Sequence, residues 1–334
     1  MLDAVVSLHN HLAQNLTGST NSTSLAPLMT HIAPLILDAS SFVRSALLEL
    51  LGDLSPRVVP REALEAHLSM LLLYIQSAMT HIQSDIRSDS TKFLSWTLDI
   101  GGTTVVRGSW TKLLESYAGL LGWTVGGLEK SRIQLARGSS VIGNVTVTAR
   151  HVATLFAFLS TGITETSSNT RQSCPKTINY AITKSLSLQH PLIAYYILPA
   201  HSAPFAHLNL FSSGQSDRQL SSHDVPSRQT HFESCLGPFL VYLHDIAAEL
   251  VPSDPWRQPN QTVVDDLRIT IVKILGLIKQ VYIDVETDDL VKRPWEKEWK
   301  RCISKTATLV DARTRSEGSR RLVREWEMAN IISS

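Results

Sequence analysis

Histidine, cysteine and serine are the side chains from which a metal site or a nucleophilic centre of this sequence would be built. The chain holds 12 His and 3 Cys residues, yet they form neither an HExxH pair nor a Cys/His spacing typical of zinc ligands. His9 and His11 fall on different sides of a predicted helix, and His201 and His207 fall in a Pro-rich segment. No GxSxG motif marks a serine nucleophile. These residues therefore predict no catalytic or metal site, and we expect no cofactor.

One glycine-containing string carries a sharper chemical hypothesis. Residues 98–104 read Leu-Asp-Ile-Gly-Gly-Thr-Thr, and an Asp-Ile-Gly-Gly-Thr string also forms the phosphate-binding hairpin of sugar kinases, where glycine amides approach a phosphate. Such a hairpin needs a strand on either side, whereas residues 93–98 continue a helical pattern. We therefore expect a helix C-terminus with Gly101 or Gly102 in the left-handed conformation, and keep a sugar-kinase-like enzyme as a remote alternative.

Charged residues are segregated near the end of the chain. An acidic run at 284–289 precedes a basic region that extends from Lys292 to Arg324. The tryptophans within this region are Trp295, Trp299 and Trp326. One interpretation is a solvated helical face. The other is contact with RNA or an acidic partner surface, for which arginine and aromatic side chains are suited, and its candidate residues are Arg320, Arg321 and Arg324.

The composition is that of a soluble globular protein. Hydrophobic residues make up 43% and charged residues 18% of the 334 residues, which argues against a disordered chain. A formal net charge of +1 gives no whole-chain attraction to nucleic acid or acidic membranes. Three widely separated cysteines suit a reducing compartment. No apolar run approaches the roughly 18 residues of a membrane span, and no signal peptide is recognised, so we expect an intracellular protein.

Helical periodicity dominates the sequence. Residues 161–176 and 212–228 are rich in Ser, Thr, Asn and Gln and are predicted to be loops. Weak alternation at 141–148 leaves room for one short extended segment but not for a sheet. The predicted helices lie at 2–16, 25–37, 41–53, 61–82, 86–99, 106–121, 147–160, 178–197, 231–250, 261–283 and 306–328.

Internal similarity indicates a repeat protein. Arg44 and Arg87 each follow a β-branched residue at the start of a predicted helix, and they lie 43 residues apart, within the roughly 40–47 residues of a HEAT repeat. The tetrapeptide Met-Thr-His-Ile occurs at 29–32 and at 79–82, and a weaker echo of the arginine segment surrounds Arg268. We therefore predict an all-α fold, a HEAT/armadillo-like α-solenoid of stacked antiparallel helix pairs.

The regularity of this pattern divides the chain into three predicted blocks. Residues 1–160 form an N-terminal HEAT-like repeat block, and residues 161–230 form a loop-rich helical connection. Residues 231–334 form a C-terminal helical block with a basic end.

Five residues near the predicted repeat junctions are candidates for partner contact. The alternative for the arginines is structural, because Asp and Arg side chains near helix starts of such repeats connect neighbouring units by hydrogen bonds. In that case Asp89 would orient Arg87, and His81 would hydrogen-bond terminal carbonyl groups. Ser84 or Asp85 would cap the following helix. The candidates are Arg44, His81, Asp85, Arg87 and Asp89.

The run at 71–90, LLLYIQSAMTHIQSDIRSDS, is more specific than any short motif. It resembles the signature of the Ipi-one family, known in animals as the testis-expressed protein ten family. Upstream, residues 35–38 and 41–45 resemble the preceding repeat of the same family, and the strong match covers roughly residues 28–100. Family members usually begin with a Lys-rich tail, whereas this sequence opens directly on a predicted helix.

The resemblance implies a non-enzymatic scaffold subunit of the Rix complex in nuclear maturation of the large ribosomal subunit. It implies a need in pre-rRNA processing at the second internal transcribed spacer and in recruiting the midasin-type AAA ATPase. The implied partners are a Rix-type helical-repeat protein, a WD-repeat protein and the pre-large-subunit particle, in the nucleolus and nucleoplasm; direct rRNA contact is left open. A generic helical-repeat adaptor in transport or chromatin is the alternative that the helical pattern allows.

Overall fold

The computed structural model describes residues 25–54, 59–123, 144–164, 224–250, 261–283, 294–311 and 317–328. Every regular element in these ranges is a helix, so the predicted all-α class is confirmed for them. No helix in the same ranges is long and apolar enough to cross a membrane. The elements are α2 (Leu25–Ile32), the 3-10 helix η1 (Ala33–Leu37), α3 (Ser41–Leu54), α4 (Arg61–Glu65), α5 (Leu68–Met79), α6 (Ser84–Leu121), α8 (Val145–Ile163), α12 (Val225–Glu249), α13 (Gln261–Tyr282), α14 (Glu296–Asp311) and α15 (Glu317–Met328).

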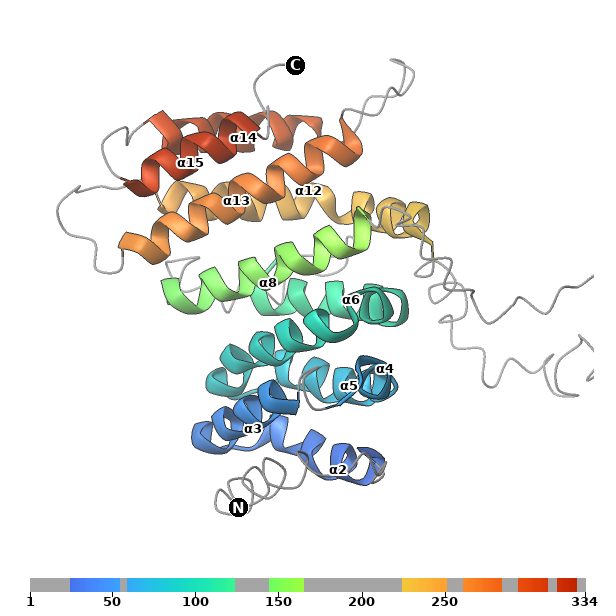
Figure 1. The fold of residues 1–334 in the computed structure, drawn as a ribbon. Coiled ribbons are helices and arrows are strands. Elements are labelled where there is room, and N and C mark those ends of the chain that lie inside the picture. Colours follow the sequence, from blue (N-terminus) through green and yellow to red (C-terminus); the bar gives the residue numbers. More distant parts are fainter. Residues whose placement is uncertain are drawn as a thin grey trace, which may run out of the picture.

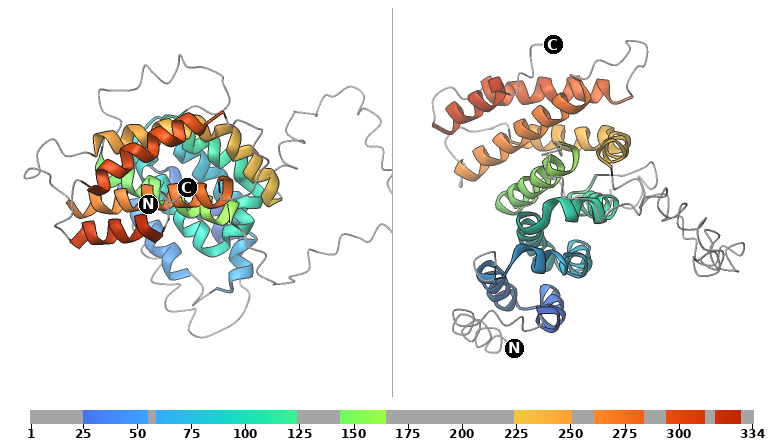
Figure 2. Two further views of the ribbon diagram at one scale, coloured as in Figure 1. Left: turned by 90° about the horizontal axis from the view of Figure 1, so that it is seen from above. Right: turned by 45° about the vertical axis from the view of Figure 1, so that its right-hand side comes forward.

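The helices stack in successive layers, from α2 at one end to α14 and α15 at the other (Figure 1). Helix α5 packs on α6, α6 packs on α8, and α8 packs on α13. In the last layers α12 packs on α14, and α13 packs on α15. The turned view in Figure 2 shows the same progression along the stack. Each layer therefore buries its apolar faces against the layers before and after it.

One hydrophobic core runs the length of the stack. Its buried residues extend from Met29 in α2 to Trp326 in α15 and form a single cluster. In the middle, the ring of Trp110 in α6 stacks on Phe158 of α8, with centroids 4.8 Å apart. Phe232 of α12 meets the same indole edge-on. These rings join helices from both halves of the chain, while the predicted division into three blocks remains a prediction.

Helix α6 is longer than the sequence predicts. The pattern predicts two helices, at 86–99 and 106–121, separated by a left-handed glycine. Instead α6 continues through the glycines, and the chain kinks at Gly101, where φ is −146° and ψ is 52°. The left-handed cap predicted here is therefore wrong. The left-handed glycine of the described ranges is Gly122, with φ 81°, which follows the last residue of α6.

Close packing explains why a glycine stands at the kink. A Cβ atom on Gly101 would overlap the side chain of Leu68 in α5 and would lie 3.1 Å from Cγ of Glu65 in α4. The missing side chain lets α6 approach the preceding helices. The Asp-Ile-Gly-Gly-Thr string thus lies inside a helix rather than between two strands, which contradicts the hairpin on which the sugar-kinase alternative depends.

The short extended segment expected at 141–148 is wrong over 145–148, where α8 begins. The preceding residue, Asn144, caps this helix: its Oδ1 accepts hydrogen bonds from the backbone N–H groups of Thr146 (3.0 Å) and Val147 (3.4 Å). β-Branched residues that alternate with polar ones can occur both in a strand and in the first turn of a capped helix. The cap, not the alternation, therefore identifies this segment.

The other helices predicted within the described ranges are helical, but several are divided or shifted at their ends. The helix predicted at 25–37 is α2 followed by the 3-10 helix η1, and the helix predicted at 61–82 is two helices, α4 and α5. Helix α12 begins at Val225, inside the loop predicted for 212–228. The helix predicted at 306–328 is two helices, and the first of them, α14, already begins at Glu296. The predicted helices at 2–16 and 178–197 lie outside the described residues.

A substitution at Gly162 would test how closely α6 and α8 pack. A Cβ atom at this position of α8 would overlap the Trp110 ring and lie 2.9 Å from its Cε3. We expect Gly162→Ala to lower the free energy of unfolding by about 1–3 kcal/mol, because the buried indole cannot move away. In the control Gly119→Ala the new Cβ meets no atom within 4 Å, and helix propensity should raise stability by about 0.5–1 kcal/mol. Urea unfolding followed by far-UV circular dichroism measures both; similar effects at the two sites would contradict the packing.

Candidate partner-binding surface

Arg44 lies in the first turn of α3 and is 1% exposed. Its guanidinium donates hydrogen bonds to the carbonyl oxygens of Asp38 (2.7 Å) and Ala39 (3.1 Å), in the turn that follows η1. It also donates from Nε (3.0 Å) and Nη2 (2.8 Å) to Oδ2 of Asp89 in α6. Arg44 therefore closes the turn before its own helix and connects α3 to α6, as the structural alternative for this arginine expects.

Asp89 forms the other end of this connection. Burial by itself would raise the pKa of Asp89, but hydrogen bonds from Lys92 and Arg44 and the charges of these two residues outweigh burial and lower the pKa. The Lys92 ammonium lies 2.7 Å from Oδ1 of Asp89. The prediction that Asp89 orients Arg87 is wrong, because its carboxylate is bound by Arg44 and Lys92 instead.

Arg87, near the start of α6, makes the corresponding contacts. Its Nη1 donates to the carbonyl oxygens of His81 (2.6 Å) and Ile82 (2.7 Å), which lie six and five residues before it, the same offsets as for Arg44. The predicted hydrogen bond from His81 to terminal carbonyls is wrong, because its Nδ1 accepts from the backbone N–H of Gln83 at 3.1 Å. Gln83 is the N-cap residue of α6 and forms no side-chain cap bond, so neither predicted capping residue caps this helix. Asp85 is exposed in the first turn, where a negative charge favours the helix dipole.

Two further arginines bind the C-terminal carbonyl groups of a preceding helix. Arg228, near the start of α12, is fully buried and donates from Nε to the carbonyl oxygen of Gly162 at 2.8 Å. Arg268 in α13 donates to the carbonyl oxygen of Leu250 and, at 2.9 Å, to Oδ1 of Asp265. The sequence pattern indicated Arg268 but missed Arg228. It missed Arg228 because that residue falls in a Ser- and Gln-rich stretch predicted to be a loop.

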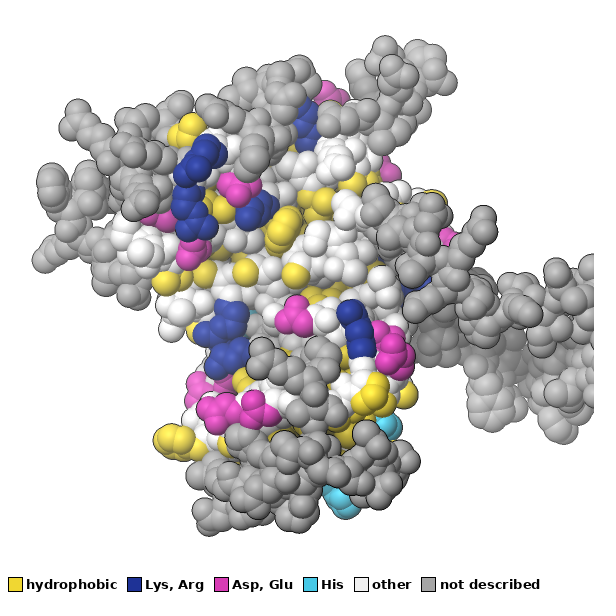
Figure 3. Space-filling view, in the orientation of Figure 1, with side chains coloured by type: hydrophobic (Ala, Val, Ile, Leu, Met, Phe, Trp, Pro, Cys, Tyr) yellow, Lys and Arg dark blue, Asp and Glu magenta, His cyan; other side chains and the backbone are white. Residues whose placement is uncertain are grey.

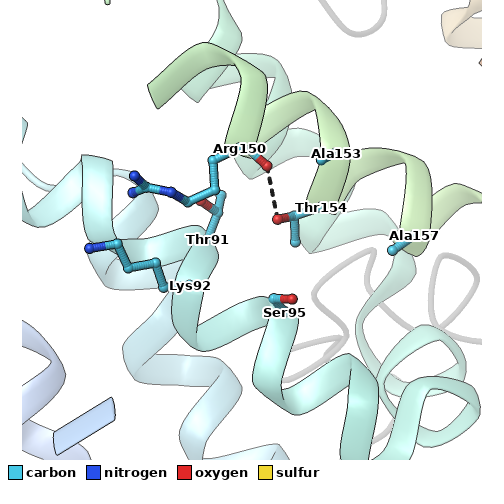
Figure 4. A pocket seen from close by; sticks show the side chains of 7 residues that line it. All are labelled: Thr91, Lys92, Ser95, Arg150, Ala153, Thr154 and Ala157. Atoms are coloured by element: carbon cyan, nitrogen blue, oxygen red, sulfur yellow. Dashed lines mark hydrogen bonds between the residues drawn. The ribbon is translucent and has the colours of Figure 1, made fainter. Parts of the chain in front are cut away.

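A shallow pocket of about 410 Å³ lies between α6 and α8, beside the ion pair of Asp89 and Lys92. Figure 4 shows α6 on one side of it and α8 on the other. Below its floor, Oγ1 of Thr91 lies 2.8 Å from Nδ1 of His151. This pocket could not be predicted from the sequence, because its residues come from two helices that are far apart in the chain. Its lining residues are Thr91, Lys92, Ser95, Arg150, Ala153, Thr154 and Ala157.

The tryptophans of the basic C-terminal region do not form a stacking surface. Trp295, Trp299 and Trp326 are 3%, 7% and 6% exposed, so the proposed base stacking on these rings is wrong. Arg321 is exposed, with Nη1 3.9 Å from Oδ1 of Asp266.

The other two basic candidates at this end are Arg320 and Arg324. Arg324 is exposed, and the side chain of Arg320 lies outside the described residues. Figure 3 shows Lys and Arg side chains in small groups next to Asp and Glu on the face it presents, without a continuous basic stripe.

The two described cysteines are buried and unsuited to nucleophilic chemistry. Burial raises the pKa of the Cys302 thiol to about 12 and also raises the pKa of Cys235, so both thiols are protonated at neutral pH. Among the described residues no group of His, Cys, Asp and Glu could hold a metal ion. Cys174 lies outside the described residues.

These features define an all-α protein whose helix junctions are tied by buried arginines. Residues 62–159, from α4 into α8, match the family model Ipi1_N, described as "Rix1 complex component involved in 60S ribosome maturation". All residues that line the pocket fall within this match. The resemblance to the Ipi-one family that the sequence predicts is thereby confirmed.

Curated relatives carry the same family name. The chain is 37% identical to "Pre-rRNA-processing protein IPI1" of Debaryomyces hansenii over 204 residues, which are 60% of this chain and 54% of the relative. It is 34% identical to the Saccharomyces cerevisiae protein of the same name over 62% of this chain and 56% of the relative. For the Chaetomium thermophilum protein the values are 30%, 69% and 64%. The chain thus spans little more than half the length of the first relatives it matches.

A solved structure is also similar in part. A chain of the assembly titled "Rix1-Rea1 pre-60S particle - 60S core, body 1 (rigid body refinement)" is 26% identical and aligns over 66% of this chain and 73% of its own length. The TM-score of this alignment is 0.39.

Removal of the Arg44 guanidinium should destabilise the fold strongly. In Arg44→Met the turn carbonyls lose their donor and the half-buried Asp89 keeps only Lys92, so we expect a loss of about 2–4 kcal/mol in the free energy of unfolding. The matched control is Arg61→Met, which removes an exposed pair with Glu65 (side chains 55% and 34% exposed) and should change stability by less than about 0.5 kcal/mol. Denaturant unfolding compares the two. Equal, small losses would show that Arg44 does not hold the junction.

The free energy of unfolding should decrease as the pH falls, because of His151. Burial lowers the pKa of His151 to about 4, with a smaller contribution from the charge of Arg150. Since the unfolded chain binds a proton near pH 6.5 and the folded chain does not, this contribution is complete above that pH and is lost as pH falls toward 4. Between pH 7 and pH 5 the loss should be on the order of 1–2 kcal/mol. It should be absent in His151→Gln and retained when the exposed His31 is changed to Gln; thermal unfolding at the two pH values measures it.

Proposed function

We propose that this protein is a non-enzymatic scaffold subunit of a Rix-type complex that acts in maturation of the large ribosomal subunit. The observation that carries the proposal is the match of residues 62–159 to a family described as a component of that complex. Relatives that share 30–37% identity with most of the chain are named as pre-rRNA-processing proteins. A role as complex component agrees with helix junctions whose buried arginines bind carbonyl groups and carboxylates within the fold.

The finer parts of the proposal concern architecture and partners. The stacked helices would form a HEAT/armadillo-like solenoid, in which each helix pair buries its apolar face only against its neighbours. The partners would be a Rix-type helical-repeat protein and a WD-repeat protein, with the pre-large-subunit particle and the midasin-type AAA ATPase bound through the assembled complex. The site of action would be the nucleolus and nucleoplasm, at the step that removes the second internal transcribed spacer.

The candidate residues would divide into residues that hold the fold together and residues that are accessible to a partner. Arg44, Arg87 and Asp89 would be architectural, since their polar atoms are bound at helix junctions. Asp85 would be open to a partner, because it is exposed on the first turn of α6. Arg321 and Arg324 would offer charges at the far end of the stack, where contact with rRNA is a possibility that their exposure permits.

Affinity purification of the tagged chain from its source cells tests the function. We expect large-subunit assembly proteins and ribosomal proteins of the large subunit in the eluate, and we expect depletion of the chain to cause accumulation of pre-rRNA that retains the second internal transcribed spacer. An untagged strain controls for background. Recovery of transport factors or chromatin proteins without assembly proteins would favour the generic adaptor instead and would contradict the proposal.

A further inference from the structure

The pocket between α6 and α8 carries an excess of positive charge at one end. Figure 4 shows that the side chains of Lys92 and Arg150 extend from the same end of it. The charge of Lys92 is opposed by Asp89 at 2.7 Å, but that carboxylate is already shared with Arg44. Arg150 adds a second positive charge at this end of the pocket, and no carboxylate is among the lining residues.

Arg150 contributes the donors that remain for an incoming group. Within the described fold its guanidinium donates from Nη1 to the carbonyl oxygen of Ser88 at 3.3 Å. A guanidinium has five N–H donors in a planar fork, and that fork matches the two oxygens of a carboxylate. His151, which follows Arg150 but points to Thr91, is neutral above pH 5 because its pKa is lowered to about 4. It adds no charge to the pocket.

The rest of the pocket is small and uncharged. Ala153 and Ala157 are exposed and lie one turn apart on α8, while Ser95 lies opposite on α6. Oγ1 of Thr154 donates a hydrogen bond to the carbonyl oxygen of Arg150, at 3.0 Å. Two exposed alanines beside a serine leave room for the methylene groups of an inserted side chain. The pocket thus combines a cationic end with a floor of small side chains.

This chemistry suits a single carboxylate better than a nucleic acid. The lining contains no aromatic side chain on which a base would stack. Asp85, exposed one turn before Asp89 on α6, would repel an extended polyanion that continues past the pocket. An isolated Asp or Glu side chain avoids that repulsion while still meeting Lys92 and Arg150.

We propose that this pocket binds an Asp or Glu side chain from an acidic segment of a protein partner. The proposal rests on the function proposed above, in that the partner is a subunit or assembly factor of the same pre-ribosomal complex. Lys92 and Arg150 hold the carboxylate, and the exposed alanines receive the aliphatic part of the side chain. All of these residues lie in the segment that matches the family model.

A zero-length carbodiimide cross-linker applied to the purified complex of the full chain tests the contact directly. The reagent bonds to a carboxylate oxygen and activates the carboxyl group. The Lys92 amine then attacks the carboxyl carbon to form an amide, and the reagent leaves with that oxygen as a urea. Mass spectrometry of the digest should find Lys92 joined to an Asp or Glu of another protein. The intrachain link from Lys92 to Asp89 serves as an internal control for reactivity.

Two variants separate charge from space. Lys92→Glu with Arg150→Glu should lower co-purification of the partner, measured without cross-linking, at least about tenfold relative to the unmodified chain. Lys112→Glu, an exposed change of the same sign elsewhere on α6, should leave recovery unchanged. Ala153→Leu with Ala157→Leu fills the pocket at exposed positions, where folding is preserved, and should lower recovery to a similar extent. Circular dichroism confirms that each variant is folded.

The outcomes distinguish this proposal from the function on which it rests. If the unmodified chain recovers no assembly proteins, the proposed function fails. If assembly proteins are recovered but Lys92 links only to Asp89, or if the pocket variants retain the partner as Lys112→Glu does, the pocket proposal alone is overturned. Ultraviolet cross-linking of Lys92 peptides to RNA in the same complex would also overturn it, in favour of a nucleic-acid contact.

Discussion

The last carbonyl groups of a helix have no partner within that helix, and in a stack of helices they lie close to the next layer. Arg228 and Arg268 donate to such carbonyl groups at the C-termini of α8 and α12. Arg44 and Arg87 donate, at identical offsets, to carbonyl groups in the turns before their own helices. A guanidinium is suited to this place because it stays charged and offers several donors in one plane. Each of these carbonyl groups therefore has a charged donor within the fold.

Once the junctions are closed, the core fixes how near the layers come. Glycines stand where two helices meet most closely, at Gly101 against α4 and α5 and at Gly162 against Trp110. Aromatic rings fill the wider space between them, and the single side chain of Trp110 contacts both α8 and α12. The described helices thus share one continuous hydrophobic core.

The same arrangement explains where recognition would occur. Most of the charged groups near the helix starts are bound within the fold, so they are poor candidates for partner contact. One accessible site among the described residues is the pocket between α6 and α8, where Lys92 and Arg150 lie at one end and the rest of the lining is small and uncharged. A scaffold of this kind would present such pockets along its length as sites for single side chains of its partners.

The all-α class, most helices, the family resemblance and the importance of Arg44 and Arg87 could be predicted from the sequence, because helical periodicity and local motifs are properties of short segments. The path of the chain through the two glycines of α6, Gly101 and Gly102, could not be predicted, since whether two glycines end or kink a helix depends on what packs against them. Nor could it be predicted that Asp89 pairs with Arg44 rather than with Arg87, that the C-terminal tryptophans are buried, or that Lys92 and Arg150 share a pocket. Those facts depend on distances between residues far apart in the chain, and these distances are set by how the helices pack.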